Sequence, residues 1–154
     1  MRKSMVVFIT LAVLAAGGAA WALDTNTLTV QASVLGTCKF STATSTLNFG
    51  ALDPSNPVLV NGSTTTQFWC TKGVATDLIT ANFGLNPAGA IRQMKDIAGA
   101  DLIPYSLTLT PDGSTNQGPA SPRTFGIGGS VLAADYTGKT AGSYADTVVL
   151  TLNP

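Results

Sequence analysis

AGSYADTVVLTL, residues 141–152, is the stretch that decides the fold of this 154-residue chain. On an extended chain, side chains at every second position share one face. In this stretch that face holds Tyr144, Val148, Leu150 and Leu152. The alternation predicts a β-strand that turns one face toward a core.

Six more runs of alternating or short apolar character precede it, with Gly, Pro, Asn, Asp and Ser between them. They lie at residues 28–34, 46–52, 63–71, 78–85, 103–110 and 124–133, and residues 86–100 are expected to form a surface loop or a weak edge strand. No segment after residue 22 has a clear helical period. This pattern is typical of an all-β sandwich or barrel. The expected core, on the more apolar faces of the runs, contains Phe68, Phe83, Tyr105, Leu107, Val148 and Leu150.

The first 22 residues have the features of a secretory signal peptide. Arg2 and Lys3 precede an apolar run at residues 5–20, and Ala20-Trp21-Ala22 matches a small-x-small cleavage site. A permanent membrane anchor is the alternative, for which the run is marginal in length. Cleavage leaves 132 residues, enough for one domain with its own core.

The composition excludes several classes of function. Without Arg2 and Lys3, six basic residues stand against eight acidic ones and form no cluster, which argues against nucleic acid as a partner. The chain has no His, so no Ser-His or Cys-His nucleophile pair and no imidazole metal ligand can form. The aspartates Asp53, Asp77, Asp112 and Asp135 lie in expected turns. We therefore expect no enzyme, no catalytic or metal site, no cofactor and no small-molecule substrate.

The chain has two cysteines, Cys38 and Cys70. An exported protein reaches an oxidising compartment, and an even cysteine count there predicts a disulfide. We expect Cys38 and Cys70 to be bonded to each other.

Several motifs follow one another in a characteristic order. Gly36-Thr37-Cys38 follows the first run, Leu47-Asn48-Phe49-Gly50 precedes Asp53-Pro54, Cys70 ends a run, and residues 141–152 close the chain. In these motifs the chain resembles the spore coat protein U domain family, the archaic chaperone–usher pilus subunits. The resemblance covers essentially all of the mature chain.

The resemblance implies an immunoglobulin-like β-sandwich that lacks its final strand and is completed by donor-strand insertion. The sandwich domain would span residues 36–154, with a donor-strand segment at residues 23–35. We expect no further strand after the 144–152 run. Inserting an alternating strand into an open sheet edge is a known recognition mode. The donor would present Leu28, Val30, Ala32 and Val34, and the acceptor-groove edge would hold Tyr144, Val148, Leu150 and Leu152. Alternatively, residues 28–34 form this subunit's own first strand.

The implied function is that of a structural subunit of a bacterial surface fibre, either a pilus (fimbria) or a coat. Its partners would be copies of itself or related pilus subunits, a periplasmic chaperone and an outer-membrane usher. It would be exported through the periplasm to the cell surface or an extracellular fibre. The alternative is a secreted adhesin or carbohydrate-binding module, in which Trp69, Tyr105 and Tyr136 would stack on sugars.

Overall fold

The computed structural model describes residues 23–74 and 78–153, and these divide into two units at the boundary between Ser33 and Val34. Residues 23–33 contain neither helix nor strand, and their side chains are exposed. The predicted signal peptide, residues 1–22, lies outside the described residues. Within the two described stretches, no helix is long and apolar enough to cross a membrane.

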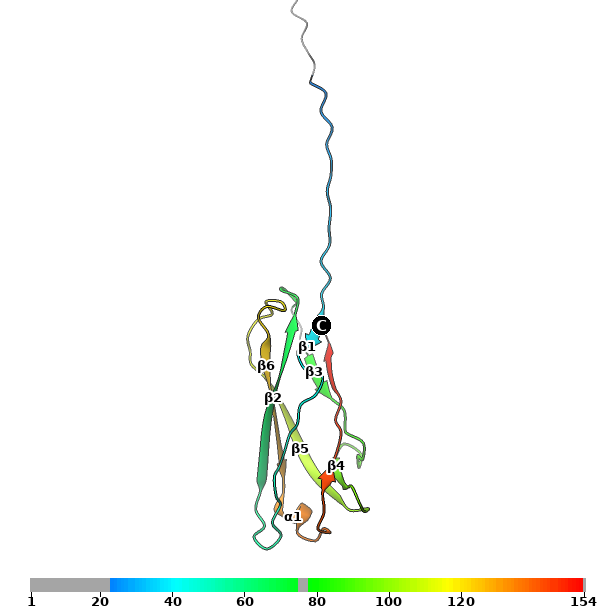
Figure 1. The fold of residues 1–154 in the computed structure, drawn as a ribbon, viewed down its shortest axis with the longest axis vertical. Coiled ribbons are helices and arrows are strands. Elements are labelled where there is room, and N and C mark those ends of the chain that lie inside the picture. Colours follow the sequence, from blue (N-terminus) through cyan, green and yellow to red (C-terminus); the bar gives the residue numbers. More distant parts are fainter. Residues whose placement is uncertain (1–22, 75–77, 154) are drawn as a thin grey trace, which may run out of the picture. The chain divides into compact units, whose positions relative to one another are not determined.

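A six-stranded antiparallel sheet forms most of the second unit, in the order β1-β2-β6-β5-β4-β7 (Figure 1). Its strands are β1 (Cys38–Phe40), β2 (Val60–Cys70), β4 (Arg92–Asp96), β5 (Leu102–Pro111), β6 (Arg123–Val131) and β7 (Tyr144–Ala145). The long strand β5 pairs with β6 along one half and with β4 along the other. The sheet therefore continues from its central strands onto β4 and β7.

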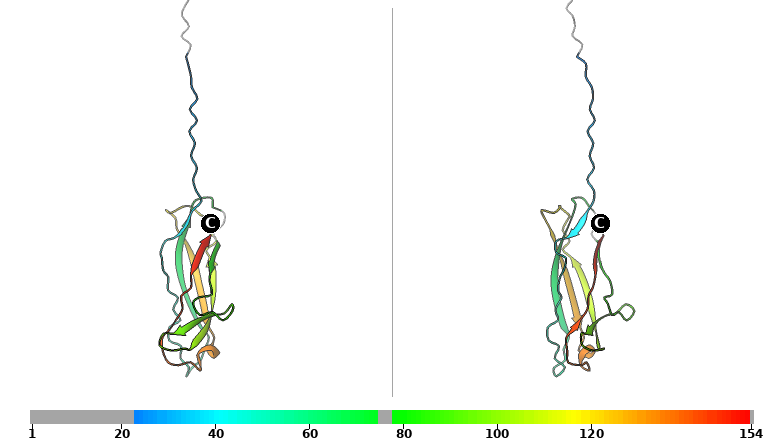
Figure 2. Two further views of the ribbon diagram at one scale, coloured as in Figure 1. Left: turned by 90° about the vertical axis from the view of Figure 1, so that its right-hand side faces the viewer. Right: turned by 45° about the vertical axis from the view of Figure 1, so that its right-hand side comes forward.

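A second, two-stranded sheet consists of β3 (Leu78–Ala81) and β8 (Leu150–Asn153). Figure 2 shows these strands on the other side of the domain from β2 and β6. Ile79 of β3 packs with Phe68, Phe125 and Ile127 of the large sheet, and Leu150 packs against the same cluster. The domain is thus an all-β sandwich, as the sequence predicts.

A second buried cluster lies near the short helix α1 (Ala133–Tyr136) and contains Ile103, Val131 and Tyr136. The Tyr136 hydroxyl accepts a hydrogen bond from the Val58 amide at 2.8 Å and donates one to the Val58 carbonyl at 3.0 Å. In Figure 1, α1 lies at one end of the sandwich, and β1 and the C-terminus lie at the other. These ends are called the α1 end and the β1 end below.

The expected disulfide joins Cys38 and Cys70 at the β1 end. The two cysteines are direct partners in the ladder between β1 and β2, and Cys70 is fully buried. The bond ties the start of the sandwich to the end of its longest strand.

Several expected elements differ from the structure. Residues 46–52 form no strand, and the 144–152 run is divided into β7 and β8. Residues 86–100, expected as a surface loop or a weak edge strand, contain β4, which lies between β5 and β7. The fourth run pairs only as far as Ala81, and Phe83 beyond it is 46% exposed. Placing Phe83 in the core was wrong, because alternation predicts a face but not where pairing stops.

Candidate functional site

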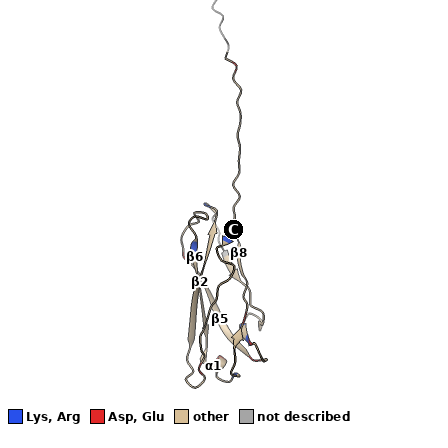
Figure 3. Ribbon diagram, in the orientation of Figure 1, with Lys and Arg blue, Asp and Glu red and all other residues tan. Residues whose placement is uncertain are grey.

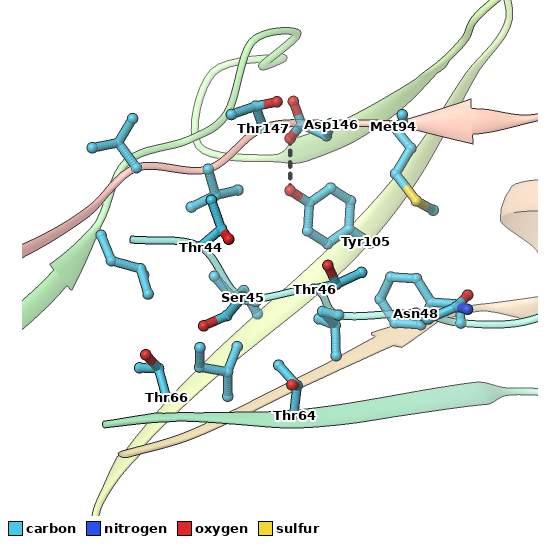
Figure 4. A pocket seen from close by; sticks show the side chains of 18 of the residues that line it. Thr44, Ser45, Thr46, Asn48, Thr64, Thr66, Met94, Tyr105, Asp146 and Thr147 are labelled. Carbon is cyan, nitrogen blue, oxygen red and sulfur yellow. Dashed lines mark hydrogen bonds between the residues drawn. The ribbon is translucent and has the colours of Figure 1, made fainter. Parts of the chain in front are cut away.

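A groove of about 690 Å³ runs along the sandwich between two extended chain segments (Figure 4). One segment is residues 42–49, called the N-side edge, and the other is residues 144–150, called the C-side edge. Strands β2, β4, β5 and β6 supply the floor. The floor side chains are Thr64, Thr66, Met94, Tyr105, Leu107 and Ile127, and Phe40 completes the lining.

The N-side edge rests on a platform made of two glycines. Gly62 of β2 and Gly129 of β6 are ladder partners. A Cβ on Gly129 would lie 2.9 Å from Leu47 Cδ2 and 3.0 Å from Phe49 Cζ, and one on Gly62 would lie 3.2 Å from Leu47 Cδ1. The absence of side chains at this pair lets Leu47 and Phe49 lie directly on the sheet.

The N-side edge is extended but pairs with no strand. In the described chain, no backbone group of residues 42–48 bonds to another backbone group. Beyond it, Gly50 has a φ of 71°, and its amide donates to Asn48 Oδ1 at 2.8 Å, so the chain turns there. Residues 46–52 therefore cannot continue as the strand that their alternation predicts.

The middle of the C-side edge is held by side chains rather than by a ladder. Asp146 Oδ2 accepts a hydrogen bond from the Tyr105 hydroxyl at 2.6 Å, drawn as a dashed line in Figure 4, and its Oδ1 accepts one from the Leu85 amide at 2.8 Å. Partial burial and the bond to this carboxylate raise the pKa of Tyr105 well above its usual range. A Cβ on Gly84 would collide with the same carboxylate.

The hydrogen bonds of Val149 determine which way the C-side edge faces. Its carbonyl accepts from the Asn82 amide at 3.1 Å, and its amide donates to Asn82 Oδ1 at 2.9 Å. Along an antiparallel pair, the backbone N–H and C=O groups of successive residues point alternately toward the partner strand and away from it. The backbone groups of Val148 and Leu150 therefore point away from β3. They point toward the groove.

The groove is therefore an apolar channel between two backbone edges, neither of which has a strand partner on its groove side in the described chain. Its inner surface comes largely from half-buried apolar and aromatic side chains, and Asp146 is the one ionisable carboxylate in the lining. Charged residues are sparse along the ribbon in general (Figure 3). In the described stretches, no three metal-ligating side chains gather into a possible metal site.

Three of the four residues expected at the acceptor edge, Tyr144, Val148 and Leu150, line the groove. Leu152, the fourth, packs against the buried cluster around Phe68. The expected donor residues Leu28, Val30, Ala32 and Val34 are all exposed and lie outside any strand.

The sequence did not identify the N-side edge or the role of Tyr105. A signal for the N-side edge was present in the Gly128-Gly129 pair, because glycines inside a strand-like run indicate a bulge or a close backbone approach. The approach is the one that Leu47 and Phe49 make at Gly129.

Two of the aspartates expected in turns, Asp53 and Asp112, accept hydrogen bonds from neighbouring groups. Asp53 Oδ1 accepts bonds from the amide and hydroxyl of Ser55. Asp112 accepts bonds from Ser114 and from the buried guanidinium of Arg123, 2.9 Å away. Partial burial opposes ionisation of Asp112, but these bonds outweigh it and lower its pKa to about 2. Asp135 lies in α1, and Asp77 lies outside the described residues.

The fold and the groove define the class of this protein as an all-β sandwich with an open apolar groove. The family model of the Spore Coat Protein U domain matches residues 24–151, and the chain belongs to this family. A search of curated protein sequences finds no match.

Among solved structures, the chain is similar in fold to the CsuC–CsuE chaperone–tip adhesion subunit pre-assembly complex from the archaic chaperone-usher Csu pili of Acinetobacter baumannii. The TM-score is 0.50 at 18% sequence identity, over 78% of this chain. The match covers 40% of the chain in that complex, so this protein spans less than half of its structural relative.

Proposed function

We propose that this protein is a structural subunit of a bacterial surface fibre, a pilus or coat, that polymerises by donor-strand exchange. The groove accepts an extended strand from the N-terminal segment of another copy or of a related subunit. The observation that carries the proposal is the pair of backbone edges that border an apolar channel without a strand partner on the groove side. Unpaired sheet edges are templates for an added strand.

The N-terminal segment suits such a groove in its chemistry. Residues 25–37 contain no charged side chain, and Leu28, Val30, Ala32 and Val34 alternate with polar residues. An inserted strand would turn this apolar row into the channel and leave the polar row outside. An unpaired charge entering the channel would lose its hydration without a partner.

The lengths also match. Residues 28–34 and residues 144–150 each span seven positions, which at about 3.3 Å per residue is about 20 Å between their first and last Cα atoms. One donor segment can therefore fill the groove along its whole C-side edge.

Before assembly, the same groove would be occupied by a periplasmic chaperone, and an outer-membrane usher would exchange that strand for the donor. The similar solved structure is a chaperone–subunit pre-assembly complex, which supports this part of the proposal. Export of the chain to the cell surface follows from the same assembly route.

The positions of the three aromatic residues argue against the carbohydrate-binding alternative. Tyr136 is buried, with its hydroxyl bonded to Val58, and the hydroxyl of Tyr105 is bonded to Asp146. Trp69 is half-buried in β2, where it pairs with Lys39 at the β1 end. These side chains do not form one sugar-stacking surface.

Self-complementation tests the proposal. The variant lacks residues 23–35 and carries a flexible linker and a copy of residues 27–35 after Pro154; it is called the self-complemented chain below. We expect a soluble monomer with a clearly higher melting temperature, whereas the unmodified mature chain self-associates or needs a chaperone. The matched control carries Asp in place of Val30 in the appended copy and should lose the gain. An unmodified mature chain that is a stable monomer and gains nothing from the added strand would refute donor-strand exchange.

A further inference from the structure

The chain contains no free linker between the donor segment and the sandwich. The Thr71 hydroxyl has two acceptors for its one hydrogen, the Leu35 carbonyl at 3.1 Å and the Thr37 carbonyl at 3.3 Å. It also accepts from the Thr37 amide at 3.0 Å, and the Thr71 amide donates to the Thr37 carbonyl at 2.8 Å. Leu35 is thus fixed to the end of β2 one residue after Val34, the last expected donor residue. A copy whose residues 28–34 fill another copy's groove must hold its own β1 end directly against that neighbour.

The direction of insertion decides which end of the neighbour it meets. The C-side edge runs from Tyr144 toward Leu150, that is, from the α1 end toward the β1 end. A donor parallel to it would leave the groove at the β1 end, where the acceptor's own residues 34–37 begin the fold. An antiparallel donor would leave at the α1 end. In the parallel arrangement, the donor's sandwich and the acceptor's own N-terminal segment would meet at the same β1 end. The antiparallel arrangement is head-to-tail, so it can repeat into an open fibre.

The α1 end carries an exposed apolar patch. Val60 and Val131 are the last ladder partners of β2 and β6, so Leu59 and Leu132 are the next residues at the end of the same two strands. Leu59 is 53% exposed and Leu132 is 58% exposed. Val58, beside them, is also exposed, and its backbone is fixed to Tyr136. The patch is therefore held in place by the buried cluster behind it.

We infer that the patch of Val58, Leu59 and Leu132 is the docking surface for the β1 end of the next copy in the fibre. This inference rests on the proposed donor-strand function. The donor enters antiparallel to residues 144–150, with Leu28 near Leu150 and Val34 near Tyr144. Tyr144 packs against the cluster of Ile103, Val131 and Tyr136 that lies behind the patch. Leu35, which is 79% exposed in the isolated chain, therefore leaves the groove beside the patch and covers it.

Cross-linking in the polymer tests the inference. The mature chain carrying Leu35→Cys and Leu132→Cys is allowed to polymerise and is treated with a short bismaleimide reagent. Both native cysteines are already joined in the disulfide. The matched control pairs Leu35→Cys with Leu85→Cys, which replaces an equally apolar residue, 71% exposed, on the loop after β3. We expect a ladder of covalent multimers for the first pair and far less for the control.

A polymer that is linked equally through both pairs, or through neither, would overturn the docking surface while leaving donor-strand exchange intact. If the self-complemented chain gains no stability, the proposed function fails, and this inference fails with it.

A second readout is independent of cross-linking. Leu132→Asp should lower the temperature at which the polymer dissociates and leave the melting temperature of the self-complemented monomer unchanged. Equal effects on both would assign Leu132 to folding rather than to docking.

Discussion

Replacing Gly129 by Ala should loosen the N-side edge, because the added methyl group has no room. Its Cβ would lie 2.8 Å from the Ser106 carbonyl oxygen, in addition to its close approaches to Leu47 and Phe49. The Ser106 oxygen belongs to the backbone of the neighbouring strand β5 and cannot move aside as a side-chain tip could. Either the sheet or the N-side edge must shift.

Overpacking of this kind typically costs about 1–3 kcal/mol. Gly128→Ala is the matched control, one residue earlier on the same strand. The Cβ at Gly128 meets only Thr108 Cβ at 4.0 Å, an ordinary contact, and its backbone φ is not positive. Gly→Ala at a compatible site stabilises by about 0.4–1 kcal/mol through the unfolded chain. The two variants should therefore differ by roughly 1.5–4 kcal/mol.

Urea unfolding of the self-complemented chain measures this difference, because a monomer permits two-state treatment. The midpoint should fall for Gly129→Ala and stay level or rise for Gly128→Ala, with similar slopes. A Gly129→Ala midpoint equal to or above that of Gly128→Ala would mean that Leu47 and Phe49 do not rest on the glycine platform. Gly62→Ala offers a second check, since its Cβ would lie 2.8 Å from the Asn48 carbonyl oxygen.

Three further changes to the self-complemented chain have defined outcomes. Cys70→Ser removes a cross-link between residues 32 apart and should cost about 3–4 kcal/mol; an unchanged urea midpoint would contradict the structural role of the disulfide. Asp112→Asn should destabilise the chain at neutral pH. Because the Asp112 pKa is about 2 when folded and near 3.8 otherwise, its contribution is present above about pH 4 and disappears as the pH falls through 2, so the variant and its parent should converge there. A constant difference across that range would show that ionisation of Asp112 is not responsible. Tyr105→Phe removes the bond to Asp146 without changing volume and should cost about 1–2 kcal/mol in urea unfolding, whereas no loss would mean that water replaces the hydroxyl.

The local sequence pattern predicted a strand correctly where the segment pairs with other alternating strands. Strands β2, β5 and β6 lie within one to three residues of the predicted runs, and Thr66, Phe68 and Cys70 share the buried face that alternation assigns to them. The disulfide followed from two cysteines in an exported chain. These features depend on the two-residue period of a strand and on composition, both of which are local properties.

Tertiary structure alone decided which extended segments have neighbours. Residues 46–49 alternate as a strand should, but lie on Gly62 and Gly129 with no strand beside them. The expected core residues Leu107, Val148 and Leu150 are only half-buried, because they border the groove. A period of two specifies which way a side chain points. Whether a backbone edge is paired depends on chain segments distant in sequence, so the groove became visible only once the sandwich had assembled around it.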